Sequence, residues 1–203
     1  MKDNFIEFNI NRFNYIKSKE LPNLDFLTPI IRRRLNKHDK AILYLLNKTV
    51  GETTKNIIFS SQTGELERLL KIIEQYSTEQ EVSPNTFSGS VHNYPVGFFI
   101  INNKKSIPYN AVSAGDNSIS AGILATICDK YKDTVFCYCD IFNDEIFAFA
   151  ISVNKFKIGK KYRLLLKNNS IKNDSFENYI KLFSEEISKL NSDIFTIERV
   201  KNA

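Results

Sequence analysis

The alternation of strand-like and helix-like segments constrains the fold of this chain more than any other feature. Short apolar runs and period-two alternation predict strands, whereas apolar residues three and four apart predict helices. Strands that alternate with helices indicate an α/β fold with a mostly parallel central sheet flanked by helices. The predicted strands cover residues 5–10, 55–61, 109–113, 134–140, 147–153, 162–167 and 194–200, and the predicted helices cover residues 30–50, 63–76, 87–101, 117–131 and 175–190.

The composition fits one globular domain over residues 1–203. Of the 203 residues, 42% are hydrophobic and 25% are charged, and the chain shows no internal repeat or low-complexity linker. A chain of this length can bury a substantial core. No stretch approaches the roughly 18 apolar residues of a membrane span, and the N-terminus lacks the apolar region of a signal peptide. We therefore expect a cytoplasmic protein without membrane insertion.

The net charge indicates which kinds of partner could bind this chain, and the number and spacing of the cysteines indicate whether they could hold a metal. The net charge is +5 and the pI is about 9.0, which suits an acidic partner. The charge is too dispersed for the basic stripe of a nucleic-acid-binding protein. Cys128, Cys137 and Cys139 are odd in number and lack CxxC metal spacing, so we expect buried, reduced, structural thiols. No metal or other cofactor is predicted.

The segment Asn110–Gly122 (NAVSAGDNSISAG) has the pattern of a strand, a sharp turn and a helix. Such a turn presents a side chain beside the free N–H groups and the positive dipole end of a helix, where a thiolate or oxyanion is stabilised. The turn holds no cysteine. Its polar candidates are Ser113, Gly115, Asp116 and Ser118.

Asp116 has two interpretations at this turn. It could act as a nucleophile or base, or its carboxylate could cap the following helix by accepting backbone N–H bonds. A capping carboxylate is held ionised and is a poor nucleophile, which favours the structural role. Ser113 and Ser118 are mostly turn formers unless a base lies beside them.

Four segments, in this order, resemble the short β-ketoacyl synthase-like family. The family corresponds to the N-terminal half of a ketosynthase, and members act in aryl polyene, polyketide or fatty-acid-type pathways, often as chain-length-factor-like proteins. The resemblance covers residues 25–155 and leaves residues 156–203 as a C-terminal extension with a helix and a strand. The segments are Ile30–Lys37 (IIRRRLNK), Phe59–Leu70 (FSSQTGELERLL), Ser83–Gly97 (SPNTFSGSVHNYPVG) and Tyr109–Ser118 (YNAVSAGDNS).

The resemblance implies a thiolase-like half-fold without autonomous condensing activity. It places Gly115, or Asp116 after a one-residue slip, where a ketosynthase carries its acyl-accepting cysteine. It also implies that the second half, which normally supplies two catalytic histidines, is missing; this chain has only His38 and His92. Decarboxylative condensation needs the thiolate together with groups that polarise the thioester.

The resemblance further implies an interface and a docking site. It places a segment beside the acyl channel at the dimer interface, with His92, Asn93, Tyr94, Phe98 and Phe99 as interface or tunnel residues. For His92 the alternative is a histidine hydrogen-bonded within a packed helix, and for the aromatic residues it is ordinary core packing. The basic cluster of Arg32, Arg33, Arg34 and Lys37 could steer an acidic acyl carrier protein, or it could be a solvated helix start with salt bridges.

Three functions remain open from the sequence. The leading prediction is a non-catalytic subunit that pairs with a cysteine-bearing ketosynthase as a heterodimer and shapes its acyl tunnel. The second is a small acyl-thioester hydrolase or acyltransferase that uses Asp116, Ser118 and His92. The third is a homodimeric binding module for acyl chains or acyl carrier proteins.

Overall fold

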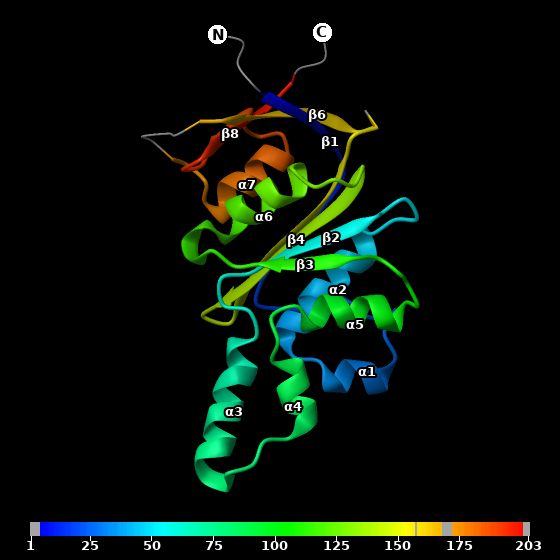
Figure 1. Cartoon of the computed structure of the whole chain (residues 1–203), viewed down its shortest axis with the longest axis vertical. Helices are drawn as coiled ribbons and strands as arrows, with labels where there is room; N and C mark the ends of the chain where they lie inside the picture. The colour runs from blue at the N-terminus through cyan, green and yellow to red at the C-terminus, as the bar shows by residue number, and fades with distance from the viewer. Residues whose placement is uncertain (1–4, 157, 168–171, 201–203) are drawn as a thin grey trace.

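An eight-stranded sheet with seven surrounding helices makes up the part of the chain that the computed structural model describes, residues 5–156, 158–167 and 172–200 (Figure 1). The strand order is β3-β2-β4-β5-β1-β6-β8-β7. The strands are β1 (Phe5–Ser18), β2 (Asn56–Ser60), β3 (Tyr109–Val112), β4 (Asp133–Phe142), β5 (Glu145–Asn154), β6 (Lys160–Leu166), β7 (Lys189–Asn191) and β8 (Phe195–Arg199). The helices are α1 (Pro29–Arg34), α2 (Lys37–Thr49), α3 (Leu66–Glu79), α4 (Pro84–Gly89), α5 (Tyr94–Asn102), α6 (Ser118–Ile127) and α7 (Phe176–Phe183).

The α/β class is confirmed, but the sheet is mixed rather than mostly parallel. Only β2 pairs in parallel, with β3 and β4, and the other pairings are antiparallel. Strands β4 and β5 are almost entirely buried, as parallel strands usually are. A two-residue turn at Asn143 and Asp144, both with positive φ, joins them as an antiparallel hairpin. Burial on both faces therefore did not indicate strand direction.

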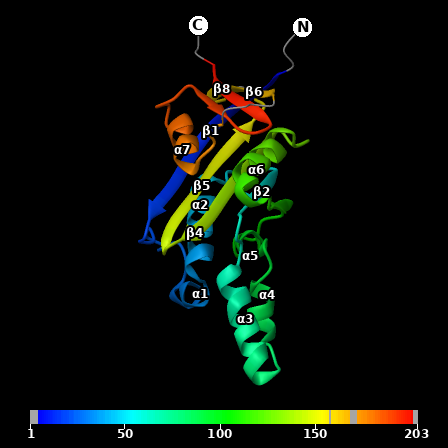
Figure 2. The same cartoon turned by 90° about the vertical axis from the view of Figure 1, so that its left-hand side faces the viewer.

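Helices cover both faces of the sheet. In Figures 1 and 2, α6 and α7 lie on one side, and α2 and α5 lie on the other. Alternate residues of β4 feed the two cores: Phe136 and Tyr138 pack with α6 and α7, whereas Cys137 and Cys139 pack with α2 and α5. These two cysteines are buried as predicted, but Cys128, just after α6, is exposed. All three are free thiols.

Several predicted helices are shorter or divided. The predicted helix over residues 30–50 is two helices, because Asn36 forms a capping box with Asp39 that starts α2 afresh. The predicted helix over residues 87–101 is also divided, since α4 ends at Gly89 and α5 starts at Tyr94. The predicted helix over residues 175–190 stops at Phe183, and its last part includes the start of β7.

Helices α3 and α4 extend from the sheet as an arm, which both views show (Figures 1 and 2). The predicted start of this helix at residue 63 is wrong: α3 begins at Leu66, and the Thr63 hydroxyl instead donates a hydrogen bond to the Asp140 carboxylate. In the described part of the chain, no helix is both long and apolar enough to span a membrane.

Candidate functional site

The turn between β3 and α6 has the predicted strand–turn–helix geometry. Strand β3 ends at Val112, a 3₁₀ turn covers Gly115–Asn117, and α6 follows at once. Gly115 has a φ of +56°, a left-handed conformation that favours glycine. No other part of the described protein lies within 4 Å of the position that a Gly115 Cβ would occupy. The tip of the turn is therefore open but carries no side chain.

The hydroxyl of Ser118 is engaged in holding this turn together. Its Oγ accepts a hydrogen bond from the Ala114 N–H (3.0 Å) and donates one to the Gly115 carbonyl (2.7 Å). The side chain is buried, whereas Ser113 is exposed. Ser118 thus holds the turn together, the role expected of it when no base lies beside it, and its hydroxyl proton is already donated to the Gly115 carbonyl.

Asp116 does not cap α6, so that structural prediction is wrong. The N-cap position is Asn117, which makes no capping side-chain bond. The 3₁₀ turn carries the Asp116 carboxylate outward, where it accepts a hydrogen bond from Gln62 Nε2 at 2.9 Å. Asp116 is exposed and connects the turn to the loop that follows β2.

That loop is organised by Asp140, a residue that the sequence analysis did not select. The fully buried carboxylate accepts bonds from the hydroxyls of Ser61 and Thr63 (both 2.7 Å) and from the N–H groups of Gln62 (2.8 Å) and Thr63 (3.0 Å). The Asp140 carboxylate therefore already accepts the backbone N–H hydrogen bonds of Gln62 and Thr63. An acidic residue near the end of an apolar strand was the only sign in the sequence that Asp140 is buried. Its partners could not be predicted, because they lie about 80 positions away in the chain.

His92 lies against this loop rather than beside Asp116. Its Nδ1 would be 2.6 Å from a Cβ on Gly64, and its ring centroid is 5.3 Å from that of Phe59. Its Nε2 is buried and has no hydrogen-bond partner within the described residues. Burial, followed by the positive charge on His38, lowers the pKa of His92. The imidazole is therefore neutral at physiological pH.

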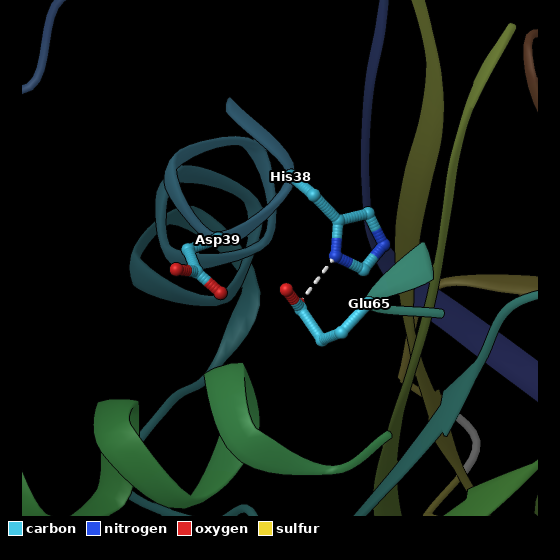
Figure 3. Close-up of side chains that lie close together, drawn as sticks. All are labelled: His38, Asp39 and Glu65. Carbon is cyan, nitrogen blue, oxygen red and sulfur yellow. Dashed lines mark hydrogen bonds and ion pairs between the residues drawn. The ribbon is translucent and has the colours of Figure 1, made fainter. Parts of the chain in front are cut away.

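A buried ionic cluster behind the loop joins α2 to α3. His38 Nδ1 lies 2.8 Å from Glu65 Oε1, the contact drawn as a dashed line in Figure 3. His38 Nε2 lies 3.1 Å from the Cys139 carbonyl. A carbonyl only accepts, so Nε2 carries a proton, and the carboxylate favours a second proton on Nδ1. Burial would lower the pKa of His38, but Cys139 and Glu65 outweigh it and raise that pKa well above its usual value.

Arg68 supplies the second positive charge of the cluster. It ion-pairs with Asp39 and Glu65, donates to the Gly89 carbonyl at 2.7 Å, and lies 4.6 Å from the centre of the Tyr94 ring. Burial and the charge of Glu65 raise the pKa of Asp39 to about 7. Burial would raise the pKa of Glu65, but His38 and Arg68 lower it.

The ligand atoms of His38, Asp39 and Glu65 lie within 4.8 Å of one another, a spacing that could hold a metal ion. Arg68, however, already reaches both carboxylates. Its guanidinium provides the positive charge that a bound cation would otherwise supply. The cluster is best described as a structural anchor between α2 and the base of the arm. The sequence analysis missed it, although the capping-box spacing of Asn36 and Asp39 was visible.

A cavity of about 640 Å³ lies between the arm and the rest of the protein, and it brings together two groups of predicted residues. Arg34 comes from the basic cluster, while Tyr94 and Phe98 come from the predicted interface segment. The remaining lining residues are mostly polar or basic: Leu35, Asn36, Arg68, Lys71, Asn85, Thr86, Ser88 and Gly89.

The other predicted residues of these two groups lie outside the cavity. Asn93 is exposed, whereas Phe99 is buried in the core with α2. Two of the basic residues form salt bridges, Arg32 with Asp25 and Lys37 with Asp144. Within the described residues, Arg33 and Arg34 are exposed and form no ion pair.

Comparison with known proteins identifies the family. A family model for the β-ketoacyl synthase N-terminal domain matches residues 9–175. The chain belongs to this family. A search of curated proteins finds no match. The resemblance seen in the sequence is thereby confirmed, and the turn between β3 and α6 lies within the matched residues.

Solved structures show the same fold at low sequence identity. One is the ketosynthase ApeO in complex with its chain length factor ApeC from Xenorhabdus doucetiae, with 18% identity, a TM-score of 0.74, and coverage of 96% of this chain and 100% of the matched chain. Another is the ishigamide ketosynthase/chain length factor, with 12% identity, a TM-score of 0.53, and coverage of 71% and 52%. The predicted thiolase-like fold is confirmed.

Proposed function

We propose that this chain is a non-catalytic β-ketoacyl synthase-like subunit that pairs with a cysteine-bearing ketosynthase and shapes its acyl tunnel. The observation that carries the proposal is the turn between β3 and α6. It has the geometry that presents a nucleophile, but its tip is Gly115, and the neighbouring Ser118 hydroxyl is committed to two hydrogen bonds.

The three cysteines offer no substitute for the missing nucleophile. Cys137 and Cys139 are buried in β4, and burial is the main factor that raises the pKa of both thiols. Cys128 follows the C-terminal end of α6, whose ten residues place it roughly 15 Å from the turn. An acyl-accepting thiolate needs the opposite environment, an accessible site at a helix N-terminus.

The neighbouring complexes support a role in pairing. Both similar structures contain a ketosynthase and a chain length factor. Within this chain, Tyr94 and Phe98 border the cavity beside the arm and are the residues that we assign to the acyl tunnel. The setting that fits is acyl-chain assembly of the polyketide, aryl polyene or fatty-acid type in the cytoplasm.

The proposal is tested by co-expression with the host's full-length ketosynthases, followed by light scattering. A stable one-to-one complex with a cysteine-bearing ketosynthase is expected. Tyr94→Ala and Phe98→Ala should then change the product chain length without breaking the complex. A monomer or homodimer that binds none of the ketosynthases would contradict the proposal.

The cavity favours carrier-protein recognition as a second function. Arg34 and the half-buried rings of Tyr94 and Phe98 combine a positive charge with apolar surface. That combination suits an acidic carrier that delivers an acyl chain. In a homodimeric binding module, the same cavity would act without a ketosynthase, and self-association in solution distinguishes this case.

The geometry favours the hydrolase or acyltransferase alternative least. Asp116 binds Gln62, Ser118 binds backbone groups, and His92 lies against Gly64 and Phe59. No hydrogen bond described in the structure joins any two of the three. Acyl-thioester turnover that disappears in both Asp116→Asn and His92→Ala would restore this alternative.

A further inference from the structure

The cavity beside the arm has positively charged residues in its lining and no carboxylate. Of its eleven lining residues, Arg34, Arg68 and Lys71 are cationic, and none is Asp or Glu. Its volume of about 640 Å³ lies within the range of small-molecule sites, about 300–1,000 Å³. A metal cation would find no charged ligand in this lining. The charge of the wall therefore favours an anion.

The three cations of the lining are not equivalent, because two of them are already paired. Arg68 forms ion pairs with two carboxylates of the buried cluster, and Lys71 lies 2.6 Å from Glu67. Arg34 is exposed and forms no ion pair or side-chain hydrogen bond within the described residues. The positive charge that remains available in the cavity is therefore the Arg34 guanidinium.

Two neutral polar groups of the arm are also without a partner in the described part of the chain. They are the side-chain amide of Asn85 and the hydroxyl of Thr86, both on α4. Other polar groups of the lining are satisfied, since Asn36 donates to Glu65 at 2.9 Å and Ser88 donates to the Asn85 carbonyl at 3.0 Å. An amide N–H, a hydroxyl and a guanidinium all donate to oxygen. The unpaired groups are thus the donors that an oxyanion needs.

An aromatic wall borders the same cavity. The rings of Tyr94 and Phe98 are half-buried, with centroids 6.0 Å apart and planes tilted by 43°. Arg68 lies over the Tyr94 ring, 4.6 Å from its centre, and also donates to the Gly89 carbonyl at 2.7 Å. These contacts form the wall before any ligand binds, so that little conformational freedom is lost on binding. Such a wall suits an apolar group attached to the oxyanion.

We propose that this cavity binds a small organic oxyanion, a carboxylate or a phosphate monoester with a short apolar body. The oxyanion is held by Arg34, Asn85 and Thr86. The apolar body lies against Tyr94 and Phe98. A guanidinium fork matches two oxygens of either head group, and such charge-assisted hydrogen bonds are stronger than neutral ones. The ligand is a free small molecule, and its binding does not depend on pairing with a ketosynthase.

NMR titration of the full-length chain with phenyl phosphate, benzoate, inorganic phosphate and phenol tests this assignment. We expect the better of the two organic anions to bind one site with a Kd of about 1 mM or lower. Which of the two binds more tightly identifies the head group. Inorganic phosphate lacks the apolar body and phenol lacks the oxyanion, so each should bind about ten-fold more weakly or less.

Arg34→Gln is the deciding variant, and Arg33→Gln is its matched control. Both changes remove one positive charge from an exposed residue without an ion pair in the described chain, but of the two only Arg34 borders the cavity. Arg34→Gln should raise the Kd of the better organic anion about ten-fold, and Arg33→Gln less than about two-fold, because solvent screens its charge. Thr86→Val removes the hydroxyl with little change of shape and should raise Kd about three-fold.

The variants are compared at an unchanged circular dichroism spectrum and melting temperature, which exposed substitutions should preserve. Equal effects of Arg34→Gln and Arg33→Gln would overturn the site, since they would reflect attraction to the whole surface. Phenol that binds as tightly as the organic anions would overturn it as well, because the oxyanion would then contribute nothing. The proposal also fails if neither organic anion binds the wild-type chain.

Discussion

At the scale of single residues, the two histidines have opposite electrostatic environments. His38 is buried between Glu65 and the Cys139 carbonyl, and its pKa is raised. Among the described residues no carboxylate forms a hydrogen bond with His92, and burial lowers its pKa. The sequence placed His92 among the candidates and gave His38 no role, whereas the structure makes His38 the more strongly bonded residue. Partners that lie 27 and 101 positions away create that difference.

Replacing His38 tests this assignment through the pH dependence of stability. A histidine whose folded pKa is raised contributes stability fully below its unfolded pKa of about 6.5, and that contribution is lost as pH rises through the folded pKa. His38→Gln should therefore lose about 2–4 kcal/mol at pH 6 and progressively less in alkaline solution. Urea unfolding of both proteins at several pH values measures the difference.

His92→Gln is the matched control for that experiment. Because the folded pKa of His92 is lowered, protonation of the unfolded state reduces wild-type stability as pH falls below about 6.5. His92→Gln should thus gain relative stability in acid, the opposite trend to His38→Gln. Parallel pH profiles for the two variants would contradict the assigned charge states.

Gly115→Cys tests whether the turn lacks only its nucleophile. The open space at Gly115 admits a thiol, and the φ of +56° should cost about 1 kcal/mol of stability. We expect an accessible thiol that a maleimide labels, but no condensing activity from this change alone, since the groups that polarise a thioester are not supplied by the substitution. Gly115→Ala controls for the strain, and condensation by Gly115→Cys would refute the non-catalytic role.

At the scale of elements, the packing of α6 on the sheet depends on one glycine. A Cβ on Gly122 would lie within 2.4 Å of the Phe136 ring and 2.9 Å of the Ser60 Cβ, both buried in the sheet. The helix could be predicted from its sequence, but the need for glycine at this position came only from the neighbouring strands.

Gly122→Ala should destabilise the protein by about 1–3 kcal/mol, although alanine favours helix formation by about 1 kcal/mol over glycine. The reason is that a rigid core ring must move to admit the methyl group. Thermal unfolding measures the change, and Phe136→Leu in the same chain should recover part of it. A stabilised Gly122→Ala protein would show that α6 can shift freely.

Helix α3 of the arm and the predicted helix over residues 175–190 show two limits of predicting structure from apolar periodicity. The apolar spacing of Leu66, Leu69, Leu70, Ile73 and Tyr76 correctly predicted an amphipathic helix. It did not indicate what that face packs against, and in the described protein the face is exposed. The predicted helix over residues 175–190 failed differently, because Leu190, which continued its periodic pattern, belongs to a strand.

At the scale of the whole molecule, the basic cluster and the predicted interface segment meet at one cavity. Arg34 borders it with Tyr94 and Phe98, about 60 residues later in the chain. If an acidic carrier protein binds on this side, its affinity should depend more on the positive charges beside the cavity than on the net charge of the whole chain.

Reversing two exposed charges tests that expectation. Arg33→Glu/Arg34→Glu should weaken binding of an acidic acyl carrier protein about ten-fold at low salt, and the effect should shrink as ionic strength rises. The control Lys130→Glu/Lys132→Glu makes the same change of net charge after α6 and should alter Kd less than about two-fold. Equal effects of the two pairs, measured by calorimetric titration, would rule out a specific docking site.

The sequence by itself determined the α/β class, the family, the strand–turn–helix over residues 110–122 and the absence of cysteine at its tip. These depend on local periodicity and on the identity of a few adjacent residues, which a sequence displays directly. Only the tertiary structure decided the strand directions, the Asp140-centred loop, the ionic cluster of His38, Asp39, Glu65 and Arg68, and the exposed face of α3. Each of these depends on which distant segments meet, and burial and charge pairing become defined only once they do.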